Sequence, residues 1–244
     1  MAKKVITFVR IIVIAMLIFI GILMIYTEQS DNIKKHLKDA KIRQENSDNK
    51  VHFDRLKATN KDVEAWIKVP GTGVDYPVVK TEDNNFYLTH DIDRSYSQFG
   101  SIFFDQRYYY RDIFEADNII IYGHNMGHWN NAMFGTLMRF KEKKFCVEHN
   151  EIYLYKENRK ILYNIVSVMR TTIEDDWYNF TQYSQEKTFL DMRQYVMDKS
   201  LYSFIAPEKC KEKFITLSTC DYDGNYRILI IGLEKDINKI KMDS

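Results

Sequence analysis

One long apolar run occupies the start of the chain. Between Val5 and Tyr26 only Thr7 and Arg10 interrupt the hydrophobic side chains. As a helix this run would extend about 33 Å, enough to cross the ~30 Å hydrocarbon core of a membrane. The pattern predicts a transmembrane anchor within residues 1–26. A cleaved signal peptide is the alternative, but the length of the run and the absence of a small-residue cleavage motif after Tyr26 disfavour it.

The next segment, Thr27–Asn60, is highly polar and carries only scattered apolar residues. Such a thin apolar stripe predicts a solvated helical stalk, with a partner-binding helix as the alternative. Basic residues lie on both sides of the apolar run, so their count does not fix the orientation of the anchor. The short N-terminal tail favours a signal anchor with the tail in the cytoplasm and the following domain outside.

Short β-type runs separated by polar breaks recur over residues 61–244, which predicts a mainly β domain. Their spacing suits a barrel or a sandwich. Pro77 lies inside one run and predicts an edge strand there, because proline cannot donate a hydrogen bond to a neighbouring strand. The eight runs are Ala65–Val69, Val74–Val79, Ser101–Phe104, Asn118–Tyr122, Glu151–Tyr155, Ile161–Met169, Phe214–Thr219 and Arg227–Leu233.

Two stretches within this domain have a helical pattern instead. Ala132–Lys144 is one, and Ser184–Lys199 is the other. In the second, Ser184 is a candidate N-cap, and apolar residues recur at helical spacing to form one face. That face is expected to contain Phe189, Met192 and Val196. The fold expected from the whole pattern is a closed β-barrel with helical insertions.

Composition narrows the class of function. The chain of 244 residues is 45% hydrophobic and has only 9 Gly and 3 Pro, so it can bury a core and is not mainly disordered. Its 35 Lys and Arg nearly balance 34 Asp and Glu, giving a net charge of +1. A nucleic-acid partner is therefore not indicated. Three cysteines are too few, and odd in number, for a disulfide framework.

A candidate nucleophile lies at the end of one predicted strand. Phe214–Cys220 is followed by a turn with an Asp-Gly signal and then by a returning strand that starts near Arg227. Cys220 and Arg227 should therefore face each other across a hairpin. A guanidinium favours a nearby thiolate, and it can also donate hydrogen bonds to an oxyanion. A small core cysteine beside a surface arginine is the alternative that this segment alone leaves open.

A histidine follows another predicted strand. Asn118–Tyr122 is apolar and breaks at Gly123, after which His124 comes directly. Imidazole can donate and accept a proton near neutral pH, as acyl transfer through a thioester requires. A purely structural histidine is the alternative. A metal-dependent hydrolase that uses His124, His128 and His149 is a more distant alternative, and no metal or other cofactor is predicted. Cys146 and Cys210 are expected to be structural thiols.

In combination these segments resemble one family, the class B sortases. The resemblance runs from about Asn60 to Leu233 and rests on two specific motifs, Tyr122–Met126 and Thr216–Cys220, together with Arg227. Upstream support comes from the segments Asp75–Val79 and Gly100–Asp105. The resemblance implies a sortase-like barrel. It also implies that the anchor holds the catalytic domain on the outer face of the membrane of a Gram-positive bacterium.

The resemblance further implies a cysteine transpeptidase that joins surface proteins to the cell wall. Cys220 would attack the threonine carbonyl of a C-terminal sorting signal, expel the residue after the threonine and form a thioacyl enzyme. An amine of the peptidoglycan cross-bridge, or of its lipid-linked precursor, would then release the product. His124 would act as general acid and then as general base, and Arg227 would stabilise the oxyanion.

Other roles follow from the resemblance position by position. Asp223 is expected to be an auxiliary acid that orients His124, with Asp221 as its competitor. A substrate groove is expected to include Asn84, Leu88, Ile173, Trp177, Tyr178 and Ser218. The types of Ile173, Trp177 and Tyr178 differ from those expected in the family, which leaves room for a different sorting signal.

Two other functions are compatible with the same residues. A cysteine endopeptidase would use the same three residues and release the acyl group to water. A membrane-anchored domain without catalysis would only bind wall or surface proteins, and the presence of Cys220, His124 and Arg227 argues against it.

Overall fold

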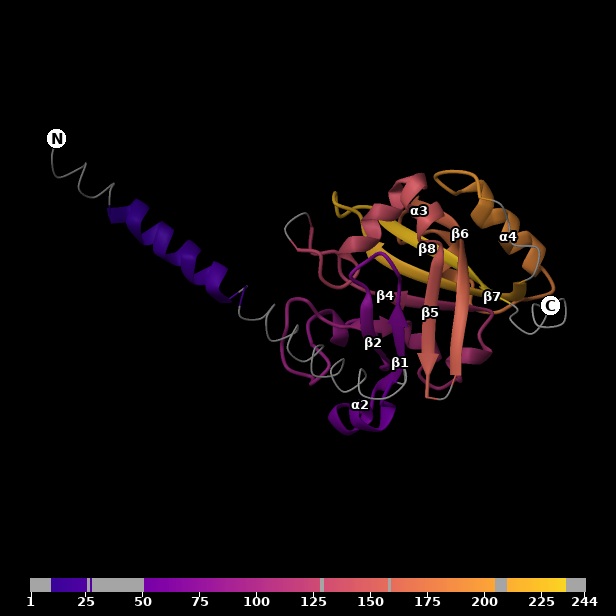
Figure 1. Cartoon of the computed structure of the whole chain (residues 1–244), viewed down its shortest axis with the longest axis horizontal. Coiled ribbons are helices and arrows are strands. Elements are labelled where there is room, and N and C mark those ends of the chain that lie inside the picture. Colours follow the sequence, from indigo (N-terminus) through magenta and orange to yellow (C-terminus); the bar gives the residue numbers. More distant parts are fainter. Residues whose placement is uncertain are drawn as a thin grey trace. The chain divides into compact units, whose positions relative to one another are not determined.

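Eight β-strands close into a barrel within the described part of the chain (Figure 1). Their order around the barrel is β1-β2-β3-β4-β7-β8-β6-β5, and β5 pairs back onto β1. The pairs β2–β3 and β4–β7 are parallel, and the other neighbours are antiparallel. The strands are β1 (Val63–Lys68), β2 (Asp75–Val79), β3 (Ile102–Phe104), β4 (Asn118–Tyr122), β5 (Glu151–Lys156), β6 (Arg159–Thr171), β7 (Cys210–Cys220) and β8 (Arg227–Lys235).

The structure is a computed structural model that describes residues 10–25, 27, 51–127, 130–157, 159–204 and 210–235. The chain divides into two compact units, Met1–Lys50 and Val51–Ser244. In the first unit residues 10–25 are helical, and most of their side chains are exposed, for example Leu17 and Phe19. No helix among the described residues has both the length and the hydropathy that a membrane span requires. The expected anchor extends beyond these residues at both ends, and the part of the expected stalk over residues 28–50 also lies outside them.

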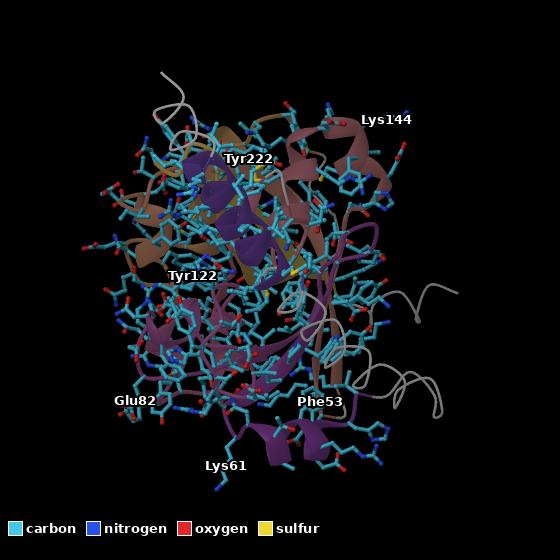
Figure 2. All side chains as sticks on the ribbon, turned by 90° about the vertical axis from the view of Figure 1, so that its left-hand side faces the viewer. Phe53, Lys61, Glu82, Tyr122, Lys144 and Tyr222 are labelled. Atoms are coloured by element: carbon cyan, nitrogen blue, oxygen red, sulfur yellow. The ribbon has the colours of Figure 1, made fainter. Side chains whose placement is uncertain are left out.

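The second unit begins ten residues before the expected boundary at residue 61. The helix α2 (Phe53–Thr59) opens it, and Phe53 is buried, so this short helix is part of the folded unit. Figure 2 shows Phe53 at the end of the barrel opposite Lys144 and Tyr222.

The prediction of a closed, mainly β barrel with helical insertions is confirmed, and a strand forms at each of the eight expected runs. The prediction of an edge strand at Pro77 is wrong, because β2 lies between β1 and β3 in the closed barrel. Proline is tolerated there because β2 pairs with β3 only at Val78 and Val79. Pro77 lies opposite Trp66 of β1 and outside the β3 ladder.

The first predicted helical insertion is two shorter elements. A 3₁₀ helix, η5 (Gly135–Lys141), is followed by α3 (Lys143–Glu148). Glu142 separates them because its backbone is extended, with φ −93° and ψ 117°. The other described 3₁₀ helices are η1 (Phe86–Leu88), η2 (Gln106–Tyr108), η3 (Ile113–Glu115) and η6 (Asp176–Asn179).

The second predicted insertion is α4 (Phe189–Asp198), which starts later than expected. Ser184 is not its N-cap. Thr188 is, and it forms a capping box in which its hydroxyl accepts from the Asp191 backbone while the Asp191 carboxylate accepts from the Thr188 backbone. The predicted face is confirmed, because Phe189, Met192 and Val196 all pack into the core.

This face of α4 covers the outside of the barrel. It joins a buried cluster with Trp177, with Phe214 of β7 and with residues of β6 and β8. Figure 1 shows the α4 ribbon beside this side of the barrel. The central residues of β7 and all but the end residues of β8 are buried. Burial on both faces of a strand explains why Ile228–Leu233 of β8 is a nearly continuous apolar run, whereas the buried part of β7 also contains Thr216, Ser218 and Thr219.

Candidate active site

The parallel pairing of β4 and β7 brings the predicted histidine and cysteine to one edge of the barrel. Tyr122 and Ser218 form the last pair of this ladder, and the Gly123 N–H donates to the Ser218 carbonyl at 3.2 Å. His124 lies two residues after Tyr122, and Cys220 lies two residues after Ser218. Parallel strands end at the same edge of a sheet, so both residues emerge there. The Asn125 side-chain amide also donates to the Cys220 carbonyl at 2.9 Å.

The antiparallel pairing of β7 and β8 adds the arginine. Cys220 lies directly opposite Arg227, as the hairpin pattern predicts. The turn between them is closed by hydrogen bonds from Asp221 N to Tyr226 O at 2.9 Å and from Gly224 N to Asp221 O at 3.0 Å. Gly224 has φ +75°, a conformation that favours glycine. Cys220, His124 and Arg227 therefore lie at one edge of the barrel, and all three are half-buried.

The backbone carbonyl of Leu88 in η1 holds the His124 ring. The distance from His124 Nε2 to Leu88 O is 2.8 Å. A carbonyl oxygen can only accept a hydrogen bond, so Nε2 must carry the proton and donate it. In neutral imidazole the lone pair then lies on Nδ1, which makes Nδ1 the nitrogen that can take a proton from a substrate or from a thiol.

Gly123 is needed where the chain leaves β4. A Cβ atom at this position would lie 2.4 Å from Ile102 Cδ1 and 2.8 Å from the Phe134 ring. Both neighbours belong to the buried core, so they cannot move away easily. Glycine therefore fits at the end of β4, directly before His124, where a larger residue would clash.

The Arg227 guanidinium is held by carbonyls of the hairpin turn. Its Nη1 donates to Gly224 O at 2.9 Å and to Tyr226 O at 3.1 Å. Both bonds use Nη1, and the other guanidinium nitrogens carry further N–H donors. A guanidinium fixed in this way beside a thiol can act as a preorganised donor to an oxyanion.

The predicted auxiliary acid lies elsewhere in the site. Asp223 accepts from Arg170 Nη2 at 2.5 Å, and its competitor Asp221 accepts from Arg170 Nε at 2.7 Å. Among the described hydrogen bonds and ion pairs, none joins either carboxylate to His124. The ring of His124 is held by Leu88 O instead, a contact that no side-chain motif in the sequence could reveal.

Three of the expected groove residues lie close to this site. Leu88 supplies the carbonyl that holds His124, and Ser218 and Tyr178 join their hydroxyls at 2.7 Å. The Tyr178 ring stacks on Tyr122, with centroids 6.4 Å apart. Burial raises the pKa of Tyr178 to about 12, so its hydroxyl stays protonated at neutral pH. Tyr178 thus contacts β7 at Ser218, two residues before Cys220.

The other expected groove residues have different surroundings. Asn84 accepts from the Gln106 backbone at 2.8 Å, and Ile173 is 60% exposed. Trp177 is 0% exposed, and its indole N–H donates to Thr216 at 2.9 Å within the core. Its predicted contact with substrate is therefore corrected. Trp177 packs against α4 and Phe214 beneath the Tyr178 loop. Burial of its large apolar side chain there is more favourable than exposure to water in a substrate groove.

Asp175 organises the same loop, although it is not among the residues predicted to be functional. Its buried carboxylate accepts from Thr171 at 2.6 Å, from the Trp177 backbone at 2.9 Å, from Tyr195 at 2.7 Å and from Lys199 at 2.8 Å. Burial by itself would raise the pKa of Asp175, but the bonds from Lys199 and the other donors lower it to about 2. The sequence signal is an acid directly before η6, which it caps.

We expect Asp175→Asn to lower the free energy of unfolding by about 2–3 kcal/mol at pH 7. The folded pKa of about 2 lies below the ordinary value of about 3.9, so the stabilisation is complete above pH 4 and is lost as pH falls towards 2. The difference between wild type and Asp175→Asn should therefore shrink over that range. Urea unfolding followed by tryptophan fluorescence at several pH values measures it, and a difference independent of pH would contradict this account.

The remaining candidate ligands do not form a cluster in the described chain. No group of three or more His, Cys, Asp or Glu is arranged there to hold a metal ion. His149 packs against the Phe145 ring, and His128 lies outside the described residues. Cys146 is buried and Cys210 half-buried, and both are free thiols, as is Cys220.

Comparison with known proteins identifies the family of this chain. The sortase domain family matches residues 67–235. Sortase B of Listeria monocytogenes is 32% identical over 200 residues, which cover 81% of this chain and 79% of that protein.

Solved structures show the same likeness. The crystal structure of Clostridium perfringens sortase B is similar with a TM-score of 0.68 and 34% identity, covering 75% of this chain and 100% of that one. A Staphylococcus aureus sortase B–substrate complex has a TM-score of 0.75 at 26% identity, covering 86% of this chain and 98% of that one. A sortase B complexed with triglycine gives the same TM-score and identity, covering 86% and 99%.

Proposed function

The chain belongs to the sortase family as a sortase B-type cysteine transpeptidase, and from this premise we propose which bond it cleaves and which group it transfers. The substrate is a surface protein with a C-terminal sorting signal that is cut after threonine. The acyl group passes through a thioester on Cys220 to an amine of the cell-wall peptidoglycan. The observation that carries the proposal is the placement of Cys220, Arg227 and His124 at one edge of the barrel.

The first half of the reaction forms the thioacyl enzyme. The Cys220 thiolate attacks the threonine carbonyl carbon, and the carbonyl oxygen becomes an oxyanion that accepts hydrogen bonds from Arg227. The peptide C–N bond then breaks as protonated His124 gives the proton on Nδ1 to the leaving amine. This assignment follows from the Leu88 carbonyl, which keeps Nε2–H occupied throughout. The thioester and neutral imidazole remain.

The second half transfers the acyl group. An incoming primary amine attacks the thioester carbonyl, and His124 Nδ1 removes one proton from that amine. The C–S bond breaks, the Cys220 thiolate leaves, and the original thiolate–imidazolium pair is restored. The solved relatives support both halves, since one is described as a substrate complex and another as a complex with triglycine, a peptide with a free amine.

The same proposal places the catalytic unit outside the membrane. The apolar run over residues 5–26 is the anchor, and its described part, residues 10–25, is helical with exposed apolar side chains. Exposed side chains of this kind favour a lipid environment. Alkaline carbonate extraction of membranes tests the anchor, because full-length chain released into the supernatant would contradict it.

The direct test uses the full chain and a panel of peptides that contain threonine-based sorting signals, with and without triglycine. Intact-mass spectrometry should show a thioacyl adduct on Cys220 that triglycine converts to a ligated peptide. An adduct released only to water would favour the endopeptidase alternative. A folded chain that forms no adduct with any peptide would leave the non-catalytic binding alternative.

A further inference from the structure

The loop between the cysteine and the arginine is wrapped around a single side chain from another strand. Arg170 of β6 lies next to this loop because it pairs with Ile228 of β8. Its guanidinium donates to Asp221 at 2.7 Å and to Asp223 at 2.5 Å, and its Cζ lies 3.5 Å from the centroid of the Tyr226 ring. Three residues of the 221–226 loop thus bind one guanidinium. Tyr222 marks this loop in Figure 2.

The inner part of this contact is buried next to the nucleophile. Asp221 follows Cys220 directly and is 6% exposed. Lys141 of η5 donates to both of its carboxylate oxygens, at 3.1 and 3.3 Å. Burial raises the pKa of Asp221, but Arg170 and Lys141 lower it below its ordinary value, so the carboxylate is charged at neutral pH. A buried charged group with two cationic partners has little freedom to move, and it limits the movement of the Cys220 backbone.

The outer part of the contact leads to Arg227. The carbonyls of Gly224 and Tyr226 accept from Arg227 Nη1, so the position of this guanidinium depends on the conformation of the loop. The Tyr226 ring, in turn, lies on Arg170. Arg170 therefore connects to both ends of the loop, to Cys220 through Asp221 and to Arg227 through Tyr226.

We propose that Arg170 is a positioning residue of the transpeptidase, which holds the 221–226 loop so that Cys220 and Arg227 keep their productive separation. The inference rests on the proposed function. It assigns to Asp221 and Asp223 the task of binding Arg170, in place of orienting His124. Catalytic groups must be held within a fraction of an ångström, and a misplacement of about 1 Å can cost about 100-fold in rate.

The test compares Arg170→Met and Arg170→Lys with Arg139→Met in the full chain. Arg139 is a matched control, because it also lies over an aromatic ring, Phe145, and donates to a backbone carbonyl, that of Gly71. We expect Arg170→Met to lower kcat roughly 10- to 100-fold and to change KM by less than about threefold. Arg170→Lys keeps the charge but cannot bind both carboxylates as a fork, so it should lie between Arg170→Met and wild type. Arg139→Met should match wild type.

A second readout needs no substrate peptide. Alkylation by iodoacetamide, measured separately for each cysteine by peptide mapping, reports the surroundings of Cys220. Cys210, a half-buried thiol at the other end of β7, is the reference within the same molecule. We expect the ratio of the Cys220 and Cys210 rates to change by at least about threefold in both Arg170 variants. Partial unfolding would instead raise the alkylation rates of both cysteines together, so their ratio would not change.

Unchanged kcat in both Arg170 variants overturns the proposal, even if the alkylation ratio changes. An unchanged ratio overturns it as well. If Arg170→Met does not fold, Arg170→Lys and Asp223→Asn decide, since Asp223 is the exposed partner and its loss should lower kcat by a smaller factor. If wild type forms no thioacyl adduct with any peptide, the proposed function fails, and the alkylation ratio still decides the role of Arg170.

Discussion

Replacing Cys220 with alanine should abolish the thioacyl adduct and lower kcat/KM by at least about 10⁴-fold. In the proposed mechanism Cys220 Sγ is the atom of the protein that bonds covalently to the substrate. Without it no thioester forms, so His124 has no leaving amine to protonate and Arg227 has no oxyanion to stabilise. The fold should persist, because Cys220 is half-buried at the end of β7 and losing its sulfur atom costs little buried surface. The free energy of unfolding should change by less than about 1 kcal/mol.

Intact-mass spectrometry and steady-state transfer to triglycine measure this effect. Cys210→Ala is the matched control, since it removes a half-buried free thiol from the opposite end of the same strand. It should keep the adduct and the rate of wild type. Ligated product from Cys220→Ala, or loss of the adduct in Cys210→Ala, would place the nucleophile elsewhere.

The barrel could be predicted from the sequence because its strands carry strong local signals. β8 is apolar over most of its length, and β7 carries apolar residues at Phe214, Ile215 and Leu217, since the barrel lies on one side and α4 on the other. The Asp-Gly turn then predicts the pairing of Cys220 with Arg227, which the structure confirms. Local pattern is enough here because the two residues belong to one hairpin.

The support of the site could not be predicted in the same way. Arg170 is separated from Asp221 by 51 positions, and nothing near it in the sequence indicates that the chain will close around it. The support of His124 is a backbone carbonyl, which every residue carries, so Leu88 is not marked by its side chain. Such contacts depend on which strands become neighbours, and local periodicity does not contain that information.

Two errors show where local and tertiary preferences compete. The resemblance places the Trp177 side chain in the groove, because it follows the β6 strand in the segment that matches a substrate loop. The core is preferred because α4 offers the indole a buried apolar site with a hydrogen-bond partner, Thr216. Ser184 fits the pattern of a cap, but Thr188 with Asp191 satisfies two backbone donors at once, so the helix begins there.

Replacing Arg227 with alanine should lower kcat about 10²- to 10³-fold, which corresponds to about 3–4 kcal/mol of lost transition-state stabilisation. The guanidinium is the one side chain directly opposite Cys220 in the hairpin, and it supplies the charge and the donors that an oxyanion needs. Single-turnover rates of thioacyl formation, measured by quenched mass spectrometry, isolate this step from acceptor binding. Thermal melting should change little, since the bonds that are lost join Arg227 to carbonyls of an exposed turn.

Arg227→Lys separates charge from geometry in this prediction. Lysine keeps the positive charge but presents a point donor, so it cannot hold the Gly224 and Tyr226 carbonyls and also offer a second fixed nitrogen to the oxyanion. We therefore expect it to recover less than about a tenth of the wild-type rate. Arg159→Ala is the control, because this exposed arginine pairs with Glu234 at the far end of β8. If Arg227→Ala stays within about threefold of wild type, the oxyanion is stabilised by other donors, and the link from Arg170 through the loop to Arg227 loses its catalytic meaning.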